Sequence, residues 1–148
     1  MIKTVVFYIV MLVLIALLGF TGFGQDKSLS GTDRAAVLTF SEAIMDNLFA
    51  GLTTNDYAVF SRDFDTDMQK NIPAANFAAW KQGLDDKFGN YLSRQVDQVT
   101  QSGEFYVVVY QAEFEQDEQV IIGVAFHASD HSISHLWFDS EKLSWSTP

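Results

Sequence analysis

The chain has 148 residues, of which 48% are hydrophobic, 14% aromatic and 19% charged, so it can form one globular core but not two ordinary domains. The 19 acidic residues outnumber the 9 basic ones and give a net charge of −10, which argues against nucleic acid as a partner because phosphate contact needs a lysine- and arginine-rich surface. The lack of cysteine excludes disulfides, thiol catalysis and thiolate metal sites.

The chain begins with an apolar segment. A single positive charge, Lys3, precedes an apolar stretch over residues 5–23, which is typical of an export signal. The small residues Gly22 and Gly24 resemble a cleavage site, whereas the stretch is also long enough to span a bilayer. The sequence therefore predicts an exported protein, periplasmic or extracellular, in which residues 1–24 are a cleaved signal peptide or a retained anchor. We expect membrane contact only through residues 5–23, if they are not cleaved.

A polar linker and a helix follow. Residues 25–32 are small and polar, which is typical of a linker, and we expect one domain over residues 33–148. The first helix should start at Asp33 and end near Gly51, because apolar residues recur there at intervals of three to four. This apolar stripe consists of Val37, Phe40, Ile44, Leu48 and Leu52.

Two more helices are predicted before the pattern changes. The stretch 55–64 has aromatic residues at helical spacing, with Asn55 or Asp56 as its cap. A third helix should begin after Pro73 and end at Gly89. Its apolar stripe consists of Phe77, Trp80, Leu84 and Phe88.

The second half of the chain has the alternating pattern of strands. β-Branched and aromatic residues dominate three stretches that are separated by turn residues, and a fourth stretch, residues 91–99, is a weaker first strand. The predicted strands are residues 91–99, 105–114, 119–127 and 132–139. Helices followed by consecutive strands predict an α+β fold, with the helices on one face of an antiparallel sheet of about four strands.

Strand register predicts which residues share a face. A three-residue loop at 116–118 would place Phe114 opposite Val120. The next hairpin would place Phe126 beside Leu136. The face expected to meet the helices, called the inner face, carries Tyr106, Val108, Tyr110, Phe114, Val120, Ile122, Val124, Phe126, Leu136 and Phe138.

The opposite, outer face is also apolar. It carries Phe105, Val107, Val109, Ile121, Gly123, Ala125, His127, Ile133, His135 and Trp137. Such a face needs a cover, either Leu143 and Trp145 near the C-terminus or a second copy of the chain. We expect a homodimer, whose interface would consist of Ile121, His127, His135 and Trp137.

The likeness to a known superfamily is carried by residues 36–69, 77–95 and 105–139. These residues resemble the nuclear-transport-factor-2-like superfamily in the order of their elements: one helix, a short aromatic and acidic helix, a third helix and a strongly bent sheet. The cone-shaped fold of that superfamily is shared with polyketide-cyclase-like proteins. Within it, the chain looks like an exported prokaryotic branch of unknown function. The resemblance implies an apolar cavity, used for catalysis in some members and for binding in others, and dimerisation through the sheet. It transfers no catalytic residue to this chain.

Two polar patterns suggest metal sites. His127 and His135 would be paired across the last hairpin and could share a zinc ion with Asp130 or Asp139, although paired surface or interface histidines explain the pattern better. The second pattern consists of Asp63, Asp65 and Asp67, which resemble the start of a calcium loop. Met68 and Ala74, however, stand where that loop needs a glycine and a glutamate. We therefore expect a solvated acidic connector and no metal or cofactor.

For function, the inner face offers polar groups only at Tyr106 and Tyr110, without a charge. This predicts a binding domain, which holds a small apolar or amphipathic ligand in the cavity or a protein partner on the outer face. The expected ligand-binding residues, which core packing would also explain, are Tyr57, Phe60, Trp80, Tyr106, Tyr110 and Phe126. One alternative is a small cofactor-independent hydrolase, isomerase or dehydratase using Asp63 and a pocket tyrosine; another is a structural envelope module.

Overall fold

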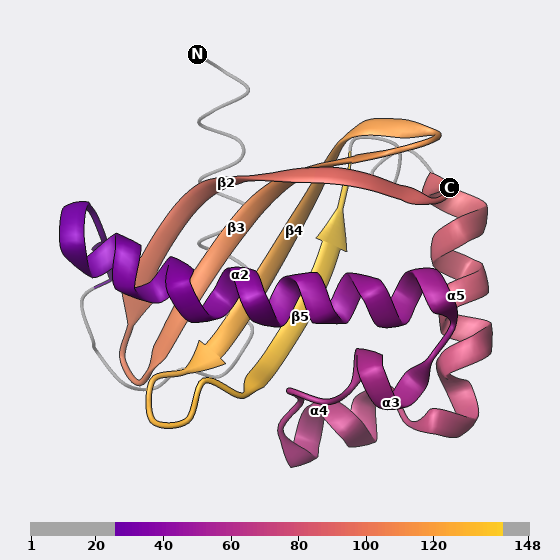
Figure 1. Cartoon of the computed structure of the whole chain (residues 1–148), viewed down its shortest axis with the longest axis horizontal. Helices are drawn as coiled ribbons and strands as arrows, with labels where there is room; N and C mark the ends of the chain where they lie inside the picture. The colour runs from indigo at the N-terminus through magenta and orange to yellow at the C-terminus, as the bar shows by residue number, and fades with distance from the viewer. Residues whose placement is uncertain (1–25, 141–148) are drawn as a thin grey trace, which may run out of the picture.

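The computed structural model describes residues 26–140. The predicted signal or anchor over residues 1–24 and the two apolar residues Leu143 and Trp145 lie outside the described residues. Within this range the protein is α+β, with helices packed on an antiparallel sheet, as the sequence predicts. Figure 1 shows α2 lying across one face of the curved sheet, with the other helices gathered beside the C-terminal end of α2.

Four helices precede the long strands. Their bounds are α2, Gly31–Thr54; α3, Tyr57–Phe60; α4, Thr66–Asn71; and α5, Ala74–Phe88. The predicted first helix continues beyond Gly51, because Asn55 takes the left-handed conformation that ends it. Helix α4 lies within the predicted acidic connector, where Asp65 caps it by accepting a hydrogen bond from the Met68 amide.

The sheet has five strands in chain order, each antiparallel to its neighbours. Their bounds are β1, Lys27–Ser28; β2, Tyr91–Ser102; β3, Phe105–Phe114; β4, Asp117–His127; and β5, Ile133–Asp139. Four of these strands were predicted, and the additional one is β1. It lies within the predicted linker and pairs with the end of β2.

The predicted register of both hairpins is wrong by two residues. Val120 lies opposite Ala112, not Phe114, because the turn contains only Glu115 and Gln116. Their amides donate to the Asn90 and Phe88 carbonyls and so tie the turn to the end of α5. Because side chains alternate with a period of two, this error leaves each residue on its predicted face.

In the second hairpin, Val124 lies opposite Leu136, and a bulge follows. The bulge places Ile133 opposite Phe126 and turns it into the core, so its assignment to the outer face is wrong.

The inner face forms the core as predicted. Its seven residues from Val108 to Phe126 belong to the main apolar cluster, and Tyr106, Leu136 and Phe138 pack against that cluster. A second cluster on the outer face contains Phe105, Val107, Val109 and Ala125, with Ile121 and Trp137 packed against it.

Helix α2 covers the core with a stripe of buried residues. By length and composition alone it could cross a membrane, but the core helix of a globular domain passes the same test, so this is weak evidence. Its buried residues are Val37, Ser41, Met45, Leu48, Phe49, Gly51 and Leu52.

Two helix-interior glycines provide a matched test of this packing. A methyl group on Gly51 would overlap the backbone nitrogen of Phe60, whereas one on Gly83 would meet nothing within 4 Å. Gly51→Ala should therefore lower the free energy of unfolding by about 2 kcal/mol. Gly83→Ala should raise it by about 0.5–1 kcal/mol, because alanine favours a helix interior. Urea denaturation measures both, and equal effects would contradict the close contact between α2 and α3.

Candidate functional site

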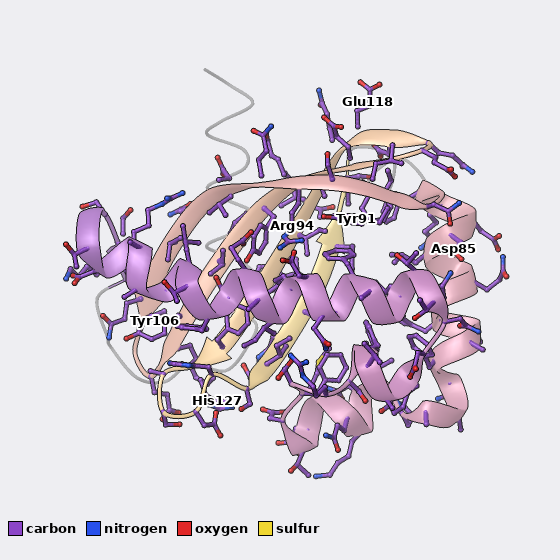
Figure 2. The ribbon with its side chains drawn as sticks, viewed as in Figure 1. Asp85, Tyr91, Arg94, Tyr106, Glu118 and His127 are labelled. Carbon is purple, nitrogen blue, oxygen red and sulfur yellow. The ribbon has the colours of Figure 1, made fainter. Side chains whose placement is uncertain are left out.

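A buried cation joins α2 to the sheet. Arg94 lies opposite Ala112 in the sheet, and its side chain is only 7% exposed. Its Nη2 atom donates to Asp46 Oδ1 at 2.7 Å and to Glu42 Oε2 at 3.1 Å, while Nη1 donates to the Tyr91 hydroxyl at 3.2 Å. Figure 2 shows Arg94 and Tyr91 between the sheet and α2. We call Ser41, Glu42, Asp46, Tyr91, Arg94 and Tyr110 the Arg94 cluster.

Aromatic rings fix the guanidinium in place. Its Cζ atom lies 5.4 Å from the centre of the Tyr110 ring and 5.7 Å from that of Phe49, and Phe49 in turn stacks on Tyr91 at 3.8 Å. These are cation–π distances. Burial acts to lower the pKa of Arg94, but the hydrogen bonds and the nearby carboxylates raise it above its ordinary value. Arg94 is therefore a permanent, oriented cation.

Several polar atoms of the Arg94 cluster are buried without a hydrogen bond of good geometry. Six side-chain atoms of the described residues are of this kind, and four of them are in this cluster. The four are Ser41 Oγ, Glu42 Oε1, Arg94 Nε and the Tyr110 hydroxyl. The Tyr110 hydroxyl nevertheless lies close enough to Ser41 and Glu42 for hydrogen bonds to both to affect its pKa. Buried polar atoms are usually well hydrogen-bonded, so such a concentration of them at one place in the core is unusual.

Their positions follow from the two elements that carry them. Ser41 lies one helical turn after Val37 on the buried stripe of α2, and both Ser41 and Tyr110 are fully buried. Hydrogen bonds to Ser41 and Glu42 both affect the pKa of the Tyr110 hydroxyl. Burial, together with the charge of Glu42, raises the pKa of Tyr110. Its hydroxyl is therefore neutral and can both donate and accept a hydrogen bond.

The predicted ligand-binding aromatics all lie in or against the main apolar cluster. Only Tyr110 belongs to the Arg94 cluster. The Tyr57 hydroxyl instead donates to the Ile72 carbonyl at 2.9 Å, and Trp80 packs 5.4 Å from Phe60. Their role in binding a ligand stays a prediction.

The inner face carries a charge that the sequence does not predict. Arg94 lies on this face, two residues before Val96, which pairs with Tyr110. The sequence does offer one signal for this placement: Arg94 and Val96 are two residues apart in the predicted strand over residues 91–99, so they share a face. Glu42 is not one of the residues of the predicted apolar stripe, but its carboxylate joins the cluster by accepting a hydrogen bond from Arg94.

The three predicted acidic residues do not converge on one point. Asp63, the candidate base, accepts hydrogen bonds from Arg62 at 2.8 and 3.1 Å. Asp65 bonds to His127 at 2.9 Å, and Asp67 bonds to Lys70 at 2.8 Å. The carboxylate next to Tyr110 is that of Glu42, not that of Asp63.

The predicted pairing of His127 with His135 is wrong. His135 lies opposite Ala125, because the hairpin is shifted by two residues. Its Nδ1 atom is 3.0 Å from Ser134 Oγ. His131, at the turn, stacks on the Phe40 ring at 3.7 Å. Over residues 26–140, no group of three or more histidine or carboxylate side chains is arranged to hold a metal ion.

The proposed interface residues are on the outer face or at its end. Trp137 lies directly over Gly123, where a methyl group would overlap its indole ring, and Ile121 packs in the same outer cluster. Figure 2 shows His127 at one end of the sheet. Their role as a dimer interface stays a prediction.

Comparison with known proteins gives no match. No family model, curated protein or solved structure matches this chain. The resemblance to the nuclear-transport-factor-2-like superfamily therefore stays a prediction based on the order of helices and strands.

Removal of the buried cation should be far more costly than removal of its exposed partner. Arg94→Met leaves the Glu42 carboxylate without its cation, so it should lower the free energy of unfolding by about 3 kcal/mol. Asp46, whose side chain is 74% exposed, provides the comparison, and Asp46→Asn should cost about 0–1 kcal/mol. Urea denaturation measures both variants, and a cost for Arg94→Met as small as that for Asp46→Asn would show that the cation does not hold α2.

Acid should weaken the fold through His135. Burial lowers its pKa, against the opposing effect of Asp65, so the unfolded chain takes up a proton at a higher pH than the folded protein does. The free energy of unfolding should therefore fall as the pH decreases through about 6.5. His135→Gln should reduce this loss between pH 7.5 and 5.5 in urea denaturation. An identical loss in the variant would contradict the assignment to His135.

Asp65 acts in a lower pH range. Burial raises the pKa of its carboxyl, but hydrogen bonds from the Met68 amide and His127 outweigh burial and hold the pKa below its ordinary value. Its contribution to stability is therefore complete above about pH 4 and is lost as the pH falls through the folded-state pKa. The two residues thus affect stability in separate pH windows.

Proposed function

We propose that this protein is an exported binding domain that holds a small amphipathic molecule between α2 and the inner face, with the polar end of the molecule at the Arg94 cluster. The observation that carries the proposal is the concentration of buried polar groups at one place in the core, with four of their atoms lacking a well-formed hydrogen bond. Export is proposed from the apolar stretch over residues 5–23.

Energetics favour a bound group as the missing partner. Each buried polar atom without a hydrogen bond destabilises the fold by about 1–3 kcal/mol. Apolar side chains at positions 41 and 110 would avoid that cost, because both positions are fully buried and surrounded by the main apolar cluster. A molecule that hydrogen-bonds to these atoms would explain why the polar groups are present.

The surroundings suit an amphipathic molecule. Glu42 and Asp46 are 41% and 74% exposed, so the Arg94 cluster reaches the solvent along one edge of α2. Val37 and Met45 flank Ser41 on the buried stripe of the same helix. A polar end bonded to the cluster would therefore leave the rest of the molecule beside apolar side chains.

One observation favours an enzyme as the second candidate. The Glu42 carboxylate and the Tyr110 hydroxyl are neighbours, and a carboxylate beside a neutral phenol is a pair that general acid–base catalysis can use. The protein would then be a cofactor-independent hydrolase, isomerase or dehydratase acting through Glu42 and Tyr110. Incubation of the retained molecule with the protein, followed by liquid chromatography and mass spectrometry, separates the two, because an enzyme converts the molecule into a product of different mass or, for an isomerase, of different retention time.

Native mass spectrometry of the full-length chain, purified gently from cells, tests the proposal. The wild type should retain an organic mass, which Ser41→Ala and Tyr110→Phe should each reduce at least about tenfold, because each removes a hydrogen bond to the bound group. Both variants should stay folded in urea denaturation, with a loss of at most about 1–1.5 kcal/mol, because each removes one hydroxyl from the buried network and keeps the surrounding apolar contacts.

Ser93→Ala provides the control. Ser93 is exposed on β2 and bonds to Glu113, so this variant should retain the molecule fully. A wild type without any organic mass would refute the binding proposal and favour a structural envelope module. Variants that lose stability but retain the mass would show that the two hydroxyls serve the fold rather than a ligand.

A further inference from the structure

We infer that the outer edge of β2 is a docking site for an extended, basic segment of a partner protein, which adds a short strand to the sheet beside residues 93–96. Backbone groups without a strand partner, an exposed leucine and an excess of negative charge occur together along this edge. The surface is separate from the buried hydroxyls of the Arg94 cluster and does not depend on the proposed function.

The edge of β2 lacks a neighbouring strand over most of its length. Among the described strands, only the two-residue β1 pairs with β2 on this side, at Thr100 and Gln101 (Figure 1). The Leu29 amide adds one hydrogen bond to the Val99 carbonyl. Residues 91–98 therefore have no strand beside them in the described part of the chain. Such an edge presents backbone donors and acceptors with which another extended chain can pair.

Two irregularities limit the part of this edge that an added strand can follow. The register of β2 on β3 shifts between Tyr91 and Ser93. It shifts again between Val96 and Gln98. A bulge bends a strand and disrupts its regular pairing, and bulges protect sheet edges against unrestricted pairing. Only residues 93–96 are regular, so the edge suits a short strand and not a long one.

An apolar side chain lies next to this regular part. Leu92 is 59% exposed, and among the described residues it is the only large hydrophobic side chain that is exposed. A single exposed leucine is common on protein surfaces, but this one adjoins backbone groups that are available for pairing. Strand addition combines main-chain hydrogen bonds with side-chain contacts of this kind. We therefore expect the partner segment to carry an apolar residue that contacts Leu92.

The charge along the edge favours a basic partner. Glu42 and Asp46, which bond to Arg94 of β2, are 41% and 74% exposed. Asp97 is exposed on β2 itself. Arg94 offsets one of these three negative charges, and its own side chain is only 7% exposed, so an approaching segment meets mainly carboxylates. Opposite charge on the partner speeds the encounter and excludes acidic competitors.

The same charges disfavour a second copy of the chain as the occupant. Pairing of two β2 edges would bring Glu42, Asp46 and Asp97 of one copy close to the same residues of the other, and like charges placed opposite one another repel. Each copy also carries a net charge of −10. A basic segment of another protein meets neither obstacle.

Three fluorescent hexapeptides test the inference by anisotropy with the full-length protein. One alternates lysine and valine, the second alternates glutamate and valine, and the third is the lysine peptide with every amide N-methylated, so that it cannot donate a hydrogen bond. The lysine peptide should bind at least about tenfold more tightly than either of the others. Equal binding of the methylated peptide would overturn strand addition, and equal binding of the glutamate peptide would overturn the charge selection. No binding of the lysine peptide would overturn the inference as a whole.

A charge reversal on the protein locates the effect. Asp97→Lys should weaken binding of the lysine peptide at least about fivefold, because it reverses an exposed charge next to residues 93–96. Asp86→Lys is the matched control, since Asp86 is also exposed but lies on α5, and it should leave the affinity unchanged. Equal losses in both variants would show a general attraction to an acidic protein and would overturn the assignment to β2.

Two further measurements identify the place and the occupant. Amide chemical shifts of the ¹⁵N-labelled protein should change around residues 92–97 when the lysine peptide is added, whereas changes centred on the outer face would overturn the inference. Sedimentation equilibrium examines the second copy. A wild-type dimer that the lysine peptide dissociates would show that the edge pairs copies of the chain, and would overturn the choice of a basic partner.

Discussion

The guanidinium of Arg94 determines how α2 lies on the sheet. A charge buried to this extent needs partners, and Glu42 and Asp46, one helical turn apart on the same edge of α2, provide them. Both carboxylates reach Nη2 only when that edge of the helix lies over β2. The same placement of α2 turns Ser41, the residue before Glu42, into the core near Tyr110. One ion network thus fixes the helix and brings the unpaired polar atoms together.

The bulge in β2 makes this arrangement possible. Arg94 and Val96 face the helices at even positions, whereas Val99 faces them at an odd position, and the register shifts between Val96 and Gln98. A regular strand would turn either Arg94 or Val99 away from the core. A bulge also increases the local twist and bend of a strand, in keeping with the curved sheet around α2 in Figure 1.

These features explain what the sequence could and could not predict. Repeating apolar spacing predicts the two long helices, α2 and α5, a helix at the place of the short α3, and the inner face, because burial acts on many residues at once. Turn lengths depend on single hydrogen bonds, such as that from Gln116 to the Phe88 carbonyl, and so both hairpin registers are wrong by two. Arg94 and Ser41 break the rule that buried positions are apolar. Their partners lie far away in the sequence, so the candidate site is visible only in the folded chain.

Within the Arg94 cluster, the ion network and the other polar groups have different surroundings. The two terminal guanidinium nitrogens of Arg94 are occupied by Glu42, Asp46 and Tyr91, which is enough to hold α2. The hydroxyls of Ser41 and Tyr110 lie deeper, where both residues are fully buried, and hydrogen bonds to Ser41 and Glu42 affect the pKa of Tyr110. Polar groups in such a place are costly to bury unless they are hydrogen-bonded, so each hydroxyl depends on the position that the Arg94 network gives to α2.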